Sequence, residues 1–177
     1  MNENRTELKV ASRSDAAAIT TLVNSVYRGE NSKKGWTTEA DFLGGIRITE
    51  EKISEIIESS DDLIILALDD NKIIGCVQLE NPQDTDYSYF GMLSVDVEYQ
   101  SKGIGKILIN ECERYTREVL GLSEIRMKVI NRRKELVEYY ERRGYVSTGE
   151  LEEFGSKEGT FGDPKVKLVF ETYSKKL

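Results

Sequence analysis

Two glycines, Gly103 and Gly105, stand between a segment of extended character and a long amphipathic run. The first turn of a helix leaves backbone N–H groups unpaired and its dipole favours anions, so a helix beginning here suits an anionic ligand. Glycines let a large anion approach the backbone closely, and Lys102 and Lys106 add positive charge. The segment therefore fits a pyrophosphate group. The alternative is a strand-to-helix turn that binds nothing.

The spacing of the glycines excludes two common phosphate sites. The dinucleotide fingerprint needs a further glycine at the sixth position counted from Gly103, and that position is Leu108. The ATP-binding loop needs Ser or Thr after its Gly-Lys pair, but Ile107 stands there, and its upstream glycine falls on Gln100. Neither motif is met.

A second group of candidate residues lies in the segment 131–145, "NRRKELVEYYERRGY". Asn131 ends a predicted strand, and Tyr140 shares a helical face with Leu136. Gly144 is a natural helix stop. Tyrosine, with a pKa of about 10, holds its proton at neutral pH and can give it to a leaving group. On an apolar helix face it can equally be a core residue.

Composition removes several kinds of chemistry. The chain of 177 residues has 25 basic and 32 acidic side chains, a net charge of −7, which argues against nucleic acid as the main partner. The same charge is compatible with a basic acceptor such as an amine. Histidine is absent, so Ser-His-Asp and Cys-His mechanisms and most catalytic zinc sites are excluded. Any chemistry must use carboxylates, tyrosine, lysine, backbone amides or water.

The two cysteines and the apolar runs bear on location. Cys76 and Cys112 lie far apart in apolar segments, so we expect buried reduced thiols, no disulfide framework and no metal site. Residues 1–10 lack the apolar core of a signal peptide, and the longest apolar run, residues 63–68, is too short to span a membrane. We expect a cytoplasmic protein, not membrane-bound, with one domain over residues 1–177.

The elements that must position these residues follow from apolar periodicity and capping signals. The expected strands lie within residues 7–15, 62–70, 72–80, 87–96, 123–130, 144–154 and 164–173. The expected helices are about 15–27, a short one from 37 or 38 to 43, then 49–59, 103–120 and 133–143. The unit 87–130 is strand-helix-strand, so its strands should be parallel with a right-handed crossover. The fold class is α/β with a mixed sheet.

Together these motifs resemble a known family. A strand is followed by Gln-x-x-Gly-x-Gly at 100–105, a helix, a second strand ending at Asn131, and Tyr-Glu-x-x-Gly-aromatic at 140–145. This order of elements and motifs resembles that of the GCN5-related N-acetyltransferases (GNAT family). The segment 27–45 also looks like a subgroup of these enzymes with a tryptophan-bearing loop. The resemblance implies a single-domain acyl-CoA N-acyltransferase fold, with a central mixed sheet flanked by helices on both faces.

The resemblance also implies acetyl-CoA as co-substrate. In the family the sheet splays open beside the strand that precedes the glycine motif, and the pantetheine arm pairs with the backbone there. Carried over, Leu93, Ser94 and Val95 would line the arm, and Asn131 would contact it from the next strand. The pyrophosphate would be held by the backbone amides of Gln100, Ser101, Lys102, Gly103, Ile104, Gly105 and Lys106.

Acyl transfer to an amine needs a base, an oxyanion donor and an acid. The family's usual oxyanion donor corresponds to the Val95 N–H, and its tyrosine acid corresponds to Tyr140. Some members place a glutamate base where this chain has Tyr89, so that pattern is not met. Glu80, at the end of the preceding strand, is the candidate base, directly or through water. The alternatives are a solvated strand end and a water relay without a dedicated base.

The sequence defines the binding site of the amine acceptor less well than that of acetyl-CoA. Tyr27 and Trp36 are expected to wall its pocket, although Trp36 can instead clamp its own short helix. Arg132, Arg133 and Lys134 are expected to be a solvated helix start, with contact to the 3′-phosphate of CoA as the alternative. The sequence thus predicts an acetyl-CoA-dependent N-acetyltransferase for a small-molecule or peptide amine, as monomer or homodimer. A non-catalytic acyl-CoA-binding or regulatory module on the same fold is the alternative.

Overall fold

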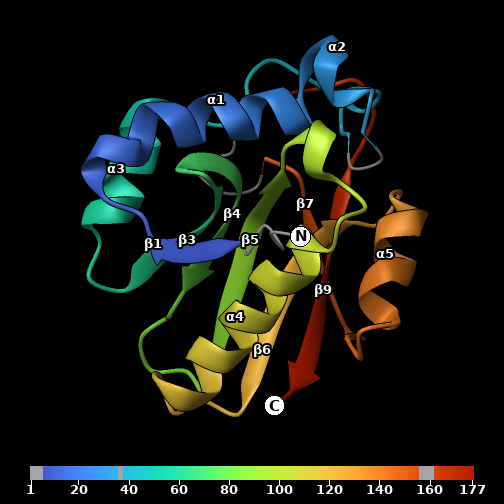
Figure 1. The fold of residues 1–177 in the computed structure, drawn as a ribbon. Helices are drawn as coiled ribbons and strands as arrows, with labels where there is room; N and C mark the ends of the chain where they lie inside the picture. Colours follow the sequence, from blue (N-terminus) through green and yellow to red (C-terminus); the bar gives the residue numbers. More distant parts are fainter. Residues whose placement is uncertain (1–5, 36–37, 156–161) are drawn as a thin grey trace.

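The computed structural model describes residues 6–35, 38–155 and 162–177. Its centre is a seven-stranded sheet in the order β1-β3-β4-β5-β6-β9-β7, and β2 pairs with β8 separately (Figure 1). The strands are β1 (Glu7–Val10), β2 (Leu43–Gly44), β3 (Asp62–Asp69), β4 (Lys72–Glu80), β5 (Tyr87–Val95), β6 (Glu124–Ile130), β7 (Val146–Glu153), β8 (Asp163–Pro164) and β9 (Val169–Lys176). The helices are α1 (Ala16–Tyr27), α2 (Gly29–Ser32), α3 (Glu50–Glu58), α4 (Ile104–Glu118) and α5 (Lys134–Glu141).

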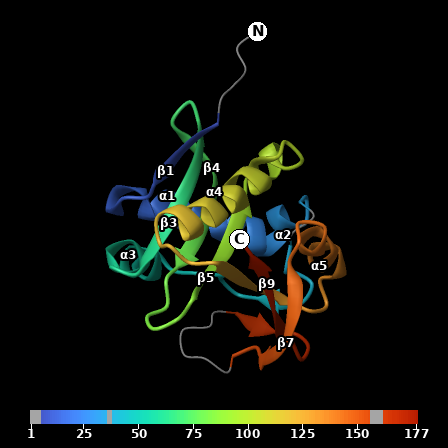
Figure 2. The same cartoon turned by 90° about the horizontal axis from the view of Figure 1, so that it is seen from below.

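Helices cover both faces of the sheet because its central strands are apolar on both sides. On β3, Ile64 and Leu66 pack in the cluster formed with α1 and α3, whereas Ile65 and Ala67 pack in the cluster formed with α4 and α5. Adjacent strand residues point to opposite faces, which explains this alternation. Figure 1 shows α4 lying along β5 and β6, and Figure 2 shows β7 beside β9 at one edge. The expected fold class is confirmed.

The β-α-β unit that carries the glycine segment is formed as predicted. β5 and β6 pair in parallel, and α4 connects them. The preceding hairpin turns at Asp70 and Asn71, which have φ of 45° and 67°. Two consecutive positive φ values are those of a tight hairpin turn, which confirms the hairpin predicted between the two strands.

Two predicted elements differ from the structure. No helix occurs over residues 38–44 of the described chain; a turn leads into β2, where Leu43 pairs with Pro164. The Thr38 hydroxyl accepts from the Ala40 N–H at 3.1 Å, a local bond that competes with helical turns. β9 correspondingly begins at Val169, not near Pro164, and runs on to Lys176.

The two thiols are buried, as expected. Cys76 and Cys112 are both 0% exposed, and burial raises the pKa of the Cys76 thiol to about 12. Burial also raises the pKa of Cys112 above its usual range. In the described part of the chain no helix has the length and apolar character needed to cross a membrane. The same residues bring together no group of three or more His, Cys, Asp or Glu suited to a metal ion.

Candidate functional site

The two parallel strands of the sheet separate after a short stretch of pairing. In the described residues β5 and β6 pair at three positions, Tyr87–Tyr89 with Glu124–Arg126, while β6 stays paired with β9 as far as Ile130. Met92 has a φ of 54°, and the pairing of β5 with β4 shifts register around it. This bulge turns the end of β5 away from β6. The sheet therefore opens beside residues 90–95.

Tyr27 fixes the opened edge of β5. Its hydroxyl donates to the Leu93 carbonyl at 2.7 Å, which satisfies a backbone acceptor where the strand is separating from β6. Burial raises the pKa of Tyr27 to about 12, so the hydroxyl keeps its proton at neutral pH. We predicted that Tyr27 would wall an acceptor pocket. The structure shows that its hydroxyl is engaged with the strand.

The loop between β5 and α4 is held by side-chain contacts. The Asp96 carboxylate accepts from the Glu98 N–H at 3.0 Å and pairs with Lys72 at 3.1 Å. The Gln100 amide donates to the Val95 carbonyl at 3.1 Å and so folds the loop back onto the strand end. Gln100 thus acts through its side chain on the loop geometry.

The glycine segment forms the predicted helix start. Gly103 has a φ of 83°, a conformation that favours glycine, and is the N-cap of α4. The first helical hydrogen bond runs from the Ile107 N–H to the Gly103 carbonyl at 3.0 Å. The N–H groups of residues 104–106 precede that bond and have no acceptor within the helix. They are the donors expected of an anion site.

A cavity of about 410 Å³, here the helix cavity, lies in front of this helix start. It joins the loop, the end of β5 and α5 in one site. Its walls include most of the residues predicted for CoA and the predicted acid: Leu93, Val95, Gln100, Ser101, Gly103, Ile104, Gly105, Lys106 and Tyr140, together with Tyr27.

Three residues predicted for CoA do not line the helix cavity. The buried Ser94 hydroxyl donates to the Met92 carbonyl at 3.0 Å. The Lys102 ammonium lies over the Tyr99 ring, 4.6 Å from its centroid. Asn131 is exposed, and its N–H donates to the Val169 carbonyl at 3.0 Å. The contacts of Ser94 and Lys102 through their side chains, and of Asn131 through its backbone, are therefore with the local structure.

Tyr140 lies at the junction of helix α5 and the core. It is 4% exposed, and the rings of Phe90, Tyr139 and Tyr145 surround it at centroid distances of 5.9, 5.3 and 5.8 Å. Burial raises the pKa of Tyr140 above its usual range. Packing therefore fixes its ring, and the hydroxyl is protonated at every physiological pH.

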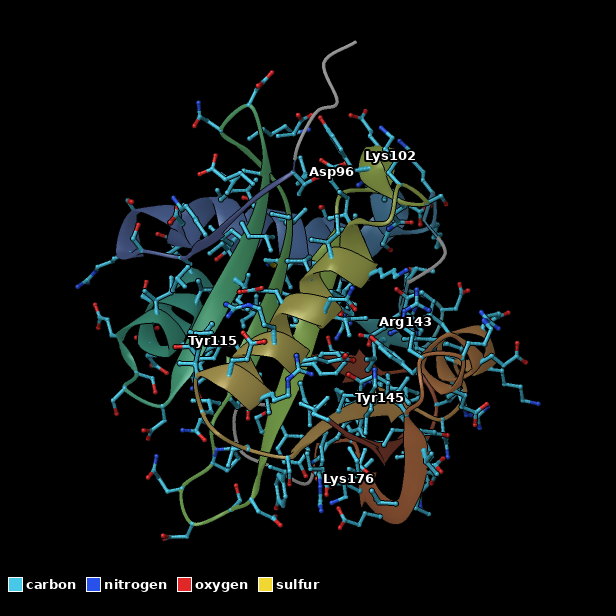
Figure 3. The ribbon with its side chains drawn as sticks, turned by 60° about the horizontal axis from the view of Figure 1, so that its bottom comes forward. Asp96, Lys102, Tyr115, Arg143, Tyr145 and Lys176 are labelled. Atoms are coloured by element: carbon cyan, nitrogen blue, oxygen red, sulfur yellow. The ribbon has the colours of Figure 1, made fainter. Side chains whose placement is uncertain are left out.

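Sequence reasoning missed Tyr139 and Arg143. A Cβ added to Gly105 would lie 3.4 Å from the Tyr139 hydroxyl, so this side chain reaches the helix start. Arg143 stacks on the Tyr139 ring at 3.5 Å and donates to the Tyr139 carbonyl at 3.1 Å. Figure 3 shows Arg143 between α4 and α5. The signal was the helical spacing, since residues 139 and 143 are one turn apart.

A narrow space of about 50 Å³, here the throat, adjoins the helix cavity where β5 and β6 separate. Both spaces are lined by Tyr27, Leu93, Arg133, Leu136 and Tyr140. The throat in turn shares walls with a third space of about 630 Å³, here the sheet cavity. The residues common to those two are Glu39, Phe90, Gly91, Lys128 and Phe170. The throat thus has walls in common with each of the two larger cavities.

Glu80, the predicted base, lines the sheet cavity and not the helix cavity. It pairs with Tyr89 in the ladder between β4 and β5, before β5 bends at Met92. Glu80 and Tyr140 therefore line different cavities: Tyr140 lines the helix cavity and the throat, and Glu80 lines the sheet cavity. Trp36, predicted for the acceptor pocket, lies outside the described residues.

A buried ion triad closes the side of the throat. Glu39 forms ion pairs with Arg28 through one carboxylate oxygen and with Arg133 through the other, the latter at 3.2 Å. All three side chains are 5–8% exposed. The triad ties the end of α1 to the start of α5. Arg133 is therefore not the solvated residue that we predicted, whereas Arg132 and Lys134 are exposed.

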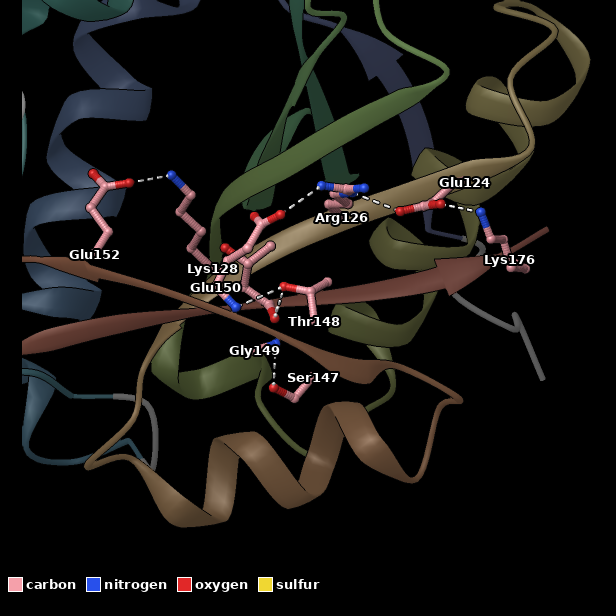
Figure 4. A network of polar contacts seen from close by, with 10 residues as sticks. Glu124, Arg126, Lys128, Ser147, Thr148, Gly149, Glu150, Glu152 and Lys176 are labelled. Atoms are coloured by element: carbon pink, nitrogen blue, oxygen red, sulfur yellow. Dashed lines mark hydrogen bonds and ion pairs between the residues drawn. The ribbon is translucent and has the colours of Figure 1, made fainter.

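The far wall of the sheet cavity is braced by ion pairs that reach across β9 from β6 to β7 (Figure 4). Lys128 pairs with Glu152 at 2.6 Å, and Arg126 lies 3.5 Å from Glu150. Lys128 and Glu152 both line the cavity. This pairing neutralises two of the charges that would otherwise face its interior.

Comparison with known proteins agrees with this architecture. The family model of the Acetyltransferase (GNAT) family matches residues 23–145. No curated protein matches the chain. A GNAT-family acetyltransferase from Streptococcus pneumoniae is similar in structure, with a TM-score of 0.69, 20% identity, and coverage of 98% of this chain and 100% of that one.

Two further solved structures extend the comparison. An N-acetyltransferase from Staphylococcus aureus Mu50 has a TM-score of 0.72 and 17% identity, with 97% of each chain covered. A spermidine N-acetyltransferase SpeG chimera from Vibrio cholerae and hSSAT has a TM-score of 0.69 and 20% identity, covering 97% of this chain and 95% of that one. At these identities the likeness shows the fold alone. With the family match over residues 23–145, it establishes that the chain belongs to the GNAT acetyltransferase family.

Proposed function

We propose that this protein is an acetyl-CoA-dependent N-acetyltransferase, acting as a single domain over residues 1–177 in the cytoplasm. It would move an acetyl group to the primary amine of a small molecule or to an exposed amino group, by direct attack in a ternary complex. The observation that carries the proposal is the helix cavity. It gathers a helix start with free N–H groups, an opened strand edge and a buried tyrosine.

The residues present fit the pyrophosphate of acetyl-CoA. A Cβ added at Gly103 would meet no atom within 4 Å, so the space in front of the loop is open to a large anion. The N–H groups of residues 104–106 supply donors, and Lys106, Arg133 and Arg143 line the same cavity. These groups supply local positive charge in a chain whose net charge is −7.

Acetyl-CoA supplies an activated thioester when bound, and each chemical need has a proposed residue. The Val95 N–H, beyond the bulge, would stabilise negative charge on the acyl oxygen. Tyr140 would donate its proton to the departing sulfur, and its raised pKa keeps that proton in place beforehand. Glu80 would take a proton from the amine in the sheet cavity, directly or through water. The throat would bring the two reactants together.

Gly105→Ala is expected to raise the melting temperature of the protein without ligand and to lower its affinity for acetyl-CoA. Alanine favours the helix over glycine by up to about 1 kcal/mol, so the variant without ligand should melt higher. The new methyl group would stand between the Tyr139 hydroxyl and the helix start and weaken acetyl-CoA binding roughly tenfold, the effect of about one hydrogen bond to a charged group. Thermal melts and calorimetric titration would measure both.

Thr21→Ala is the control for that variant. Thr21 is exposed on α1, far along the chain from the glycine segment and outside the cavity walls. Its replacement also raises helix propensity, so the melting temperature should rise while acetyl-CoA affinity stays the same. A Gly105→Ala variant that binds acetyl-CoA as tightly as the wild type would contradict the proposed anion site.

The direct test of function is release of free CoA from acetyl-CoA in the presence of a panel of amines. The panel should contain polyamines, amino acids, aminoglycosides and peptides with free N-termini. Turnover with at least one amine, with mass spectrometry showing its N-acetyl product, supports the proposal. Binding of acetyl-CoA with no product from any amine would favour a non-catalytic acyl-CoA-binding module.

A further inference from the structure

We infer that the sheet cavity takes an acceptor that carries an anionic group beside its amine, as amino acids do, and that Arg47 binds that anion. The inference rests on the proposed acetyl transfer and names its substrate class. It starts from the charges that surround the throat and the sheet cavity. In the part of the chain that the structure describes, four cations and three carboxylates line these spaces: Arg28, Arg47, Lys128 and Arg133, with Glu39, Glu80 and Glu152.

Two of the carboxylates are already neutralised by the protein itself. Glu39 is shared by Arg28 and Arg133, and Glu152 is paired with Lys128. Glu39 is almost completely buried, and Lys128 and Glu152 are each about one quarter exposed. These carboxylates are therefore not available to hold a second ammonium group of an acceptor. Among the described residues Glu80 is the third carboxylate that lines the cavity, and it is the proposed base for the reacting amine.

Arg47 is the cation left over. Within the described chain no carboxylate forms an ion pair with it, and its contact is with the Tyr27 ring, 5.4 Å from guanidinium carbon to centroid. Arg47 is half-buried in the wall of the sheet cavity. A guanidinium in such a place is suited to a carboxylate, which it binds through two parallel hydrogen bonds.

The backbone at Arg47 is held firmly against α1. The side chain of Asn24 accepts from the Arg47 N–H at 2.7 Å and from the Ile48 N–H at 3.1 Å, and it donates to the Ile48 carbonyl at 2.9 Å. Three hydrogen bonds from one side chain therefore fix the position of residues 47 and 48. A binding group on such a rigid support needs little ordering when the ligand arrives.

The position of Arg47 relates the anion to the reaction. Its guanidinium lies over Tyr27, and the Tyr27 hydroxyl is bonded to Leu93 on the opened edge of β5. An anion on Arg47 is therefore separated from the throat by one aromatic ring. An acceptor whose amine and anion are a few bonds apart can reach both places, whereas a polyamine would set a second ammonium against Arg47, an unfavourable pairing of like charges.

Matched pairs of acceptors test the inference. Each pair contains an amino acid and the amine formed by loss of its α-carboxylate: phenylalanine with phenethylamine, lysine with cadaverine, and glutamate with 4-aminobutyrate. The last pair also varies the position of the anion, because 4-aminobutyrate keeps a carboxylate farther from its amine. For wild-type protein we expect kcat/KM at least tenfold higher for the member with the carboxylate next to the amine in at least one pair. Binding of the same compounds to the CoA-loaded protein gives a second readout that needs no turnover.

Variants identify Arg47 as the residue responsible. Arg47→Gln should remove the preference within the pair, and Arg47→Lys should restore part of it. Arg13→Gln, which alters an exposed ion pair with Glu58, should leave the preference unchanged. Equal responses to both members, a response to neither in both assays, or an Arg47→Gln variant with the wild-type preference would overturn the inference.

The affinity for acetyl-CoA separates this inference from the proposed function. Arg47 does not line the helix cavity, so Arg47→Gln should bind acetyl-CoA as tightly as the wild type. Turnover of simple amines with no preference for a carboxylate would leave acetyl transfer intact and reject only the anion site. Absence of acetyl-CoA binding in the wild type would instead reject the proposed function itself.

Discussion

Tyr140→Phe is expected to lower kcat about a hundredfold while leaving acetyl-CoA affinity unchanged. Loss of a positioned acid typically costs 10² to 10⁴ in rate, and the ring itself is retained among Phe90, Tyr139 and Tyr145. Because burial raises the pKa of Tyr140, the wild-type rate should show no decline from its ionisation up to about pH 10. Steady-state kinetics over a range of pH, with a calorimetric Kd, would measure both effects.

Tyr145→Phe is the matched control. Tyr145 is 1% exposed and lies in the same aromatic group, but its hydroxyl donates to Glu113 at 2.9 Å, and it does not line the helix cavity. Losing that bond should cost about 1–3 kcal/mol of unfolding free energy and leave kcat close to the wild-type value. If Tyr140→Phe keeps wild-type kcat, Tyr140 is a core residue and the proposed acid is wrong.

Glu39→Ala is expected to lower the free energy of unfolding by about 3–5 kcal/mol. Removing one member of a buried ion group leaves its partners charged and desolvated, and the loss of a buried partner typically has that size. Here two arginines, Arg28 and Arg133, would lose their shared carboxylate. Because the triad forms one side of the throat, its loss should disturb the shape of the throat, and kcat/KM for the acceptor should fall as well. Urea unfolding with kinetics of the surviving folded protein would show both.

Glu58→Ala gives the comparison for an exposed ion pair. Glu58 pairs with Arg13 on the surface, where both side chains are more than half exposed, and such pairs contribute about 0–1 kcal/mol. A Glu39→Ala variant no less stable than Glu58→Ala would show that the triad contributes little to folding. Its proposed role in shaping the throat would then have no support.

The parts of the site that are local in sequence were predictable. The glycine segment, the helix that follows it and Tyr140 all lie within one strand-helix-strand-helix unit, where spacing and periodicity determine their relative positions. The structure accordingly places Gly103, Gly105 and Tyr140 on one cavity. The strand before them was also predicted, because its turn residues and apolar run are local signals.

The parts that depend on contacts between distant segments were not predictable. Glu39 and Arg133 are 94 residues apart, and nothing in the local pattern around either one indicates that they meet. The short helix predicted from residue 37 or 38 to 43 is absent over the described residues 38–43 for a related reason, since Leu43 pairs with Pro164 far along the chain. Tertiary contacts override local propensity in both places.

The acceptor side shows how overall composition can mislead. The net charge of −7 is compatible with a cationic acceptor, yet among the described residues the throat and the sheet cavity are lined by one more cation than carboxylate. The local balance depends on which residues pair, as Lys128 does with Glu152. Only the folded structure shows that Arg47 lies over the Tyr27 ring in the wall of the sheet cavity, with no ion pair to a carboxylate of the described residues.

The most direct test of the central claim, that the helix cavity binds acetyl-CoA, is thermal unfolding of the wild-type protein with increasing acetyl-CoA. At a hundredfold excess over Kd, binding should add about 2.7 kcal/mol of stability. For a chain of this size that is a rise of about 5–10 °C in Tm, and ATP and NADH at the same concentrations should give much less. An unchanged Tm at millimolar acetyl-CoA would contradict the account.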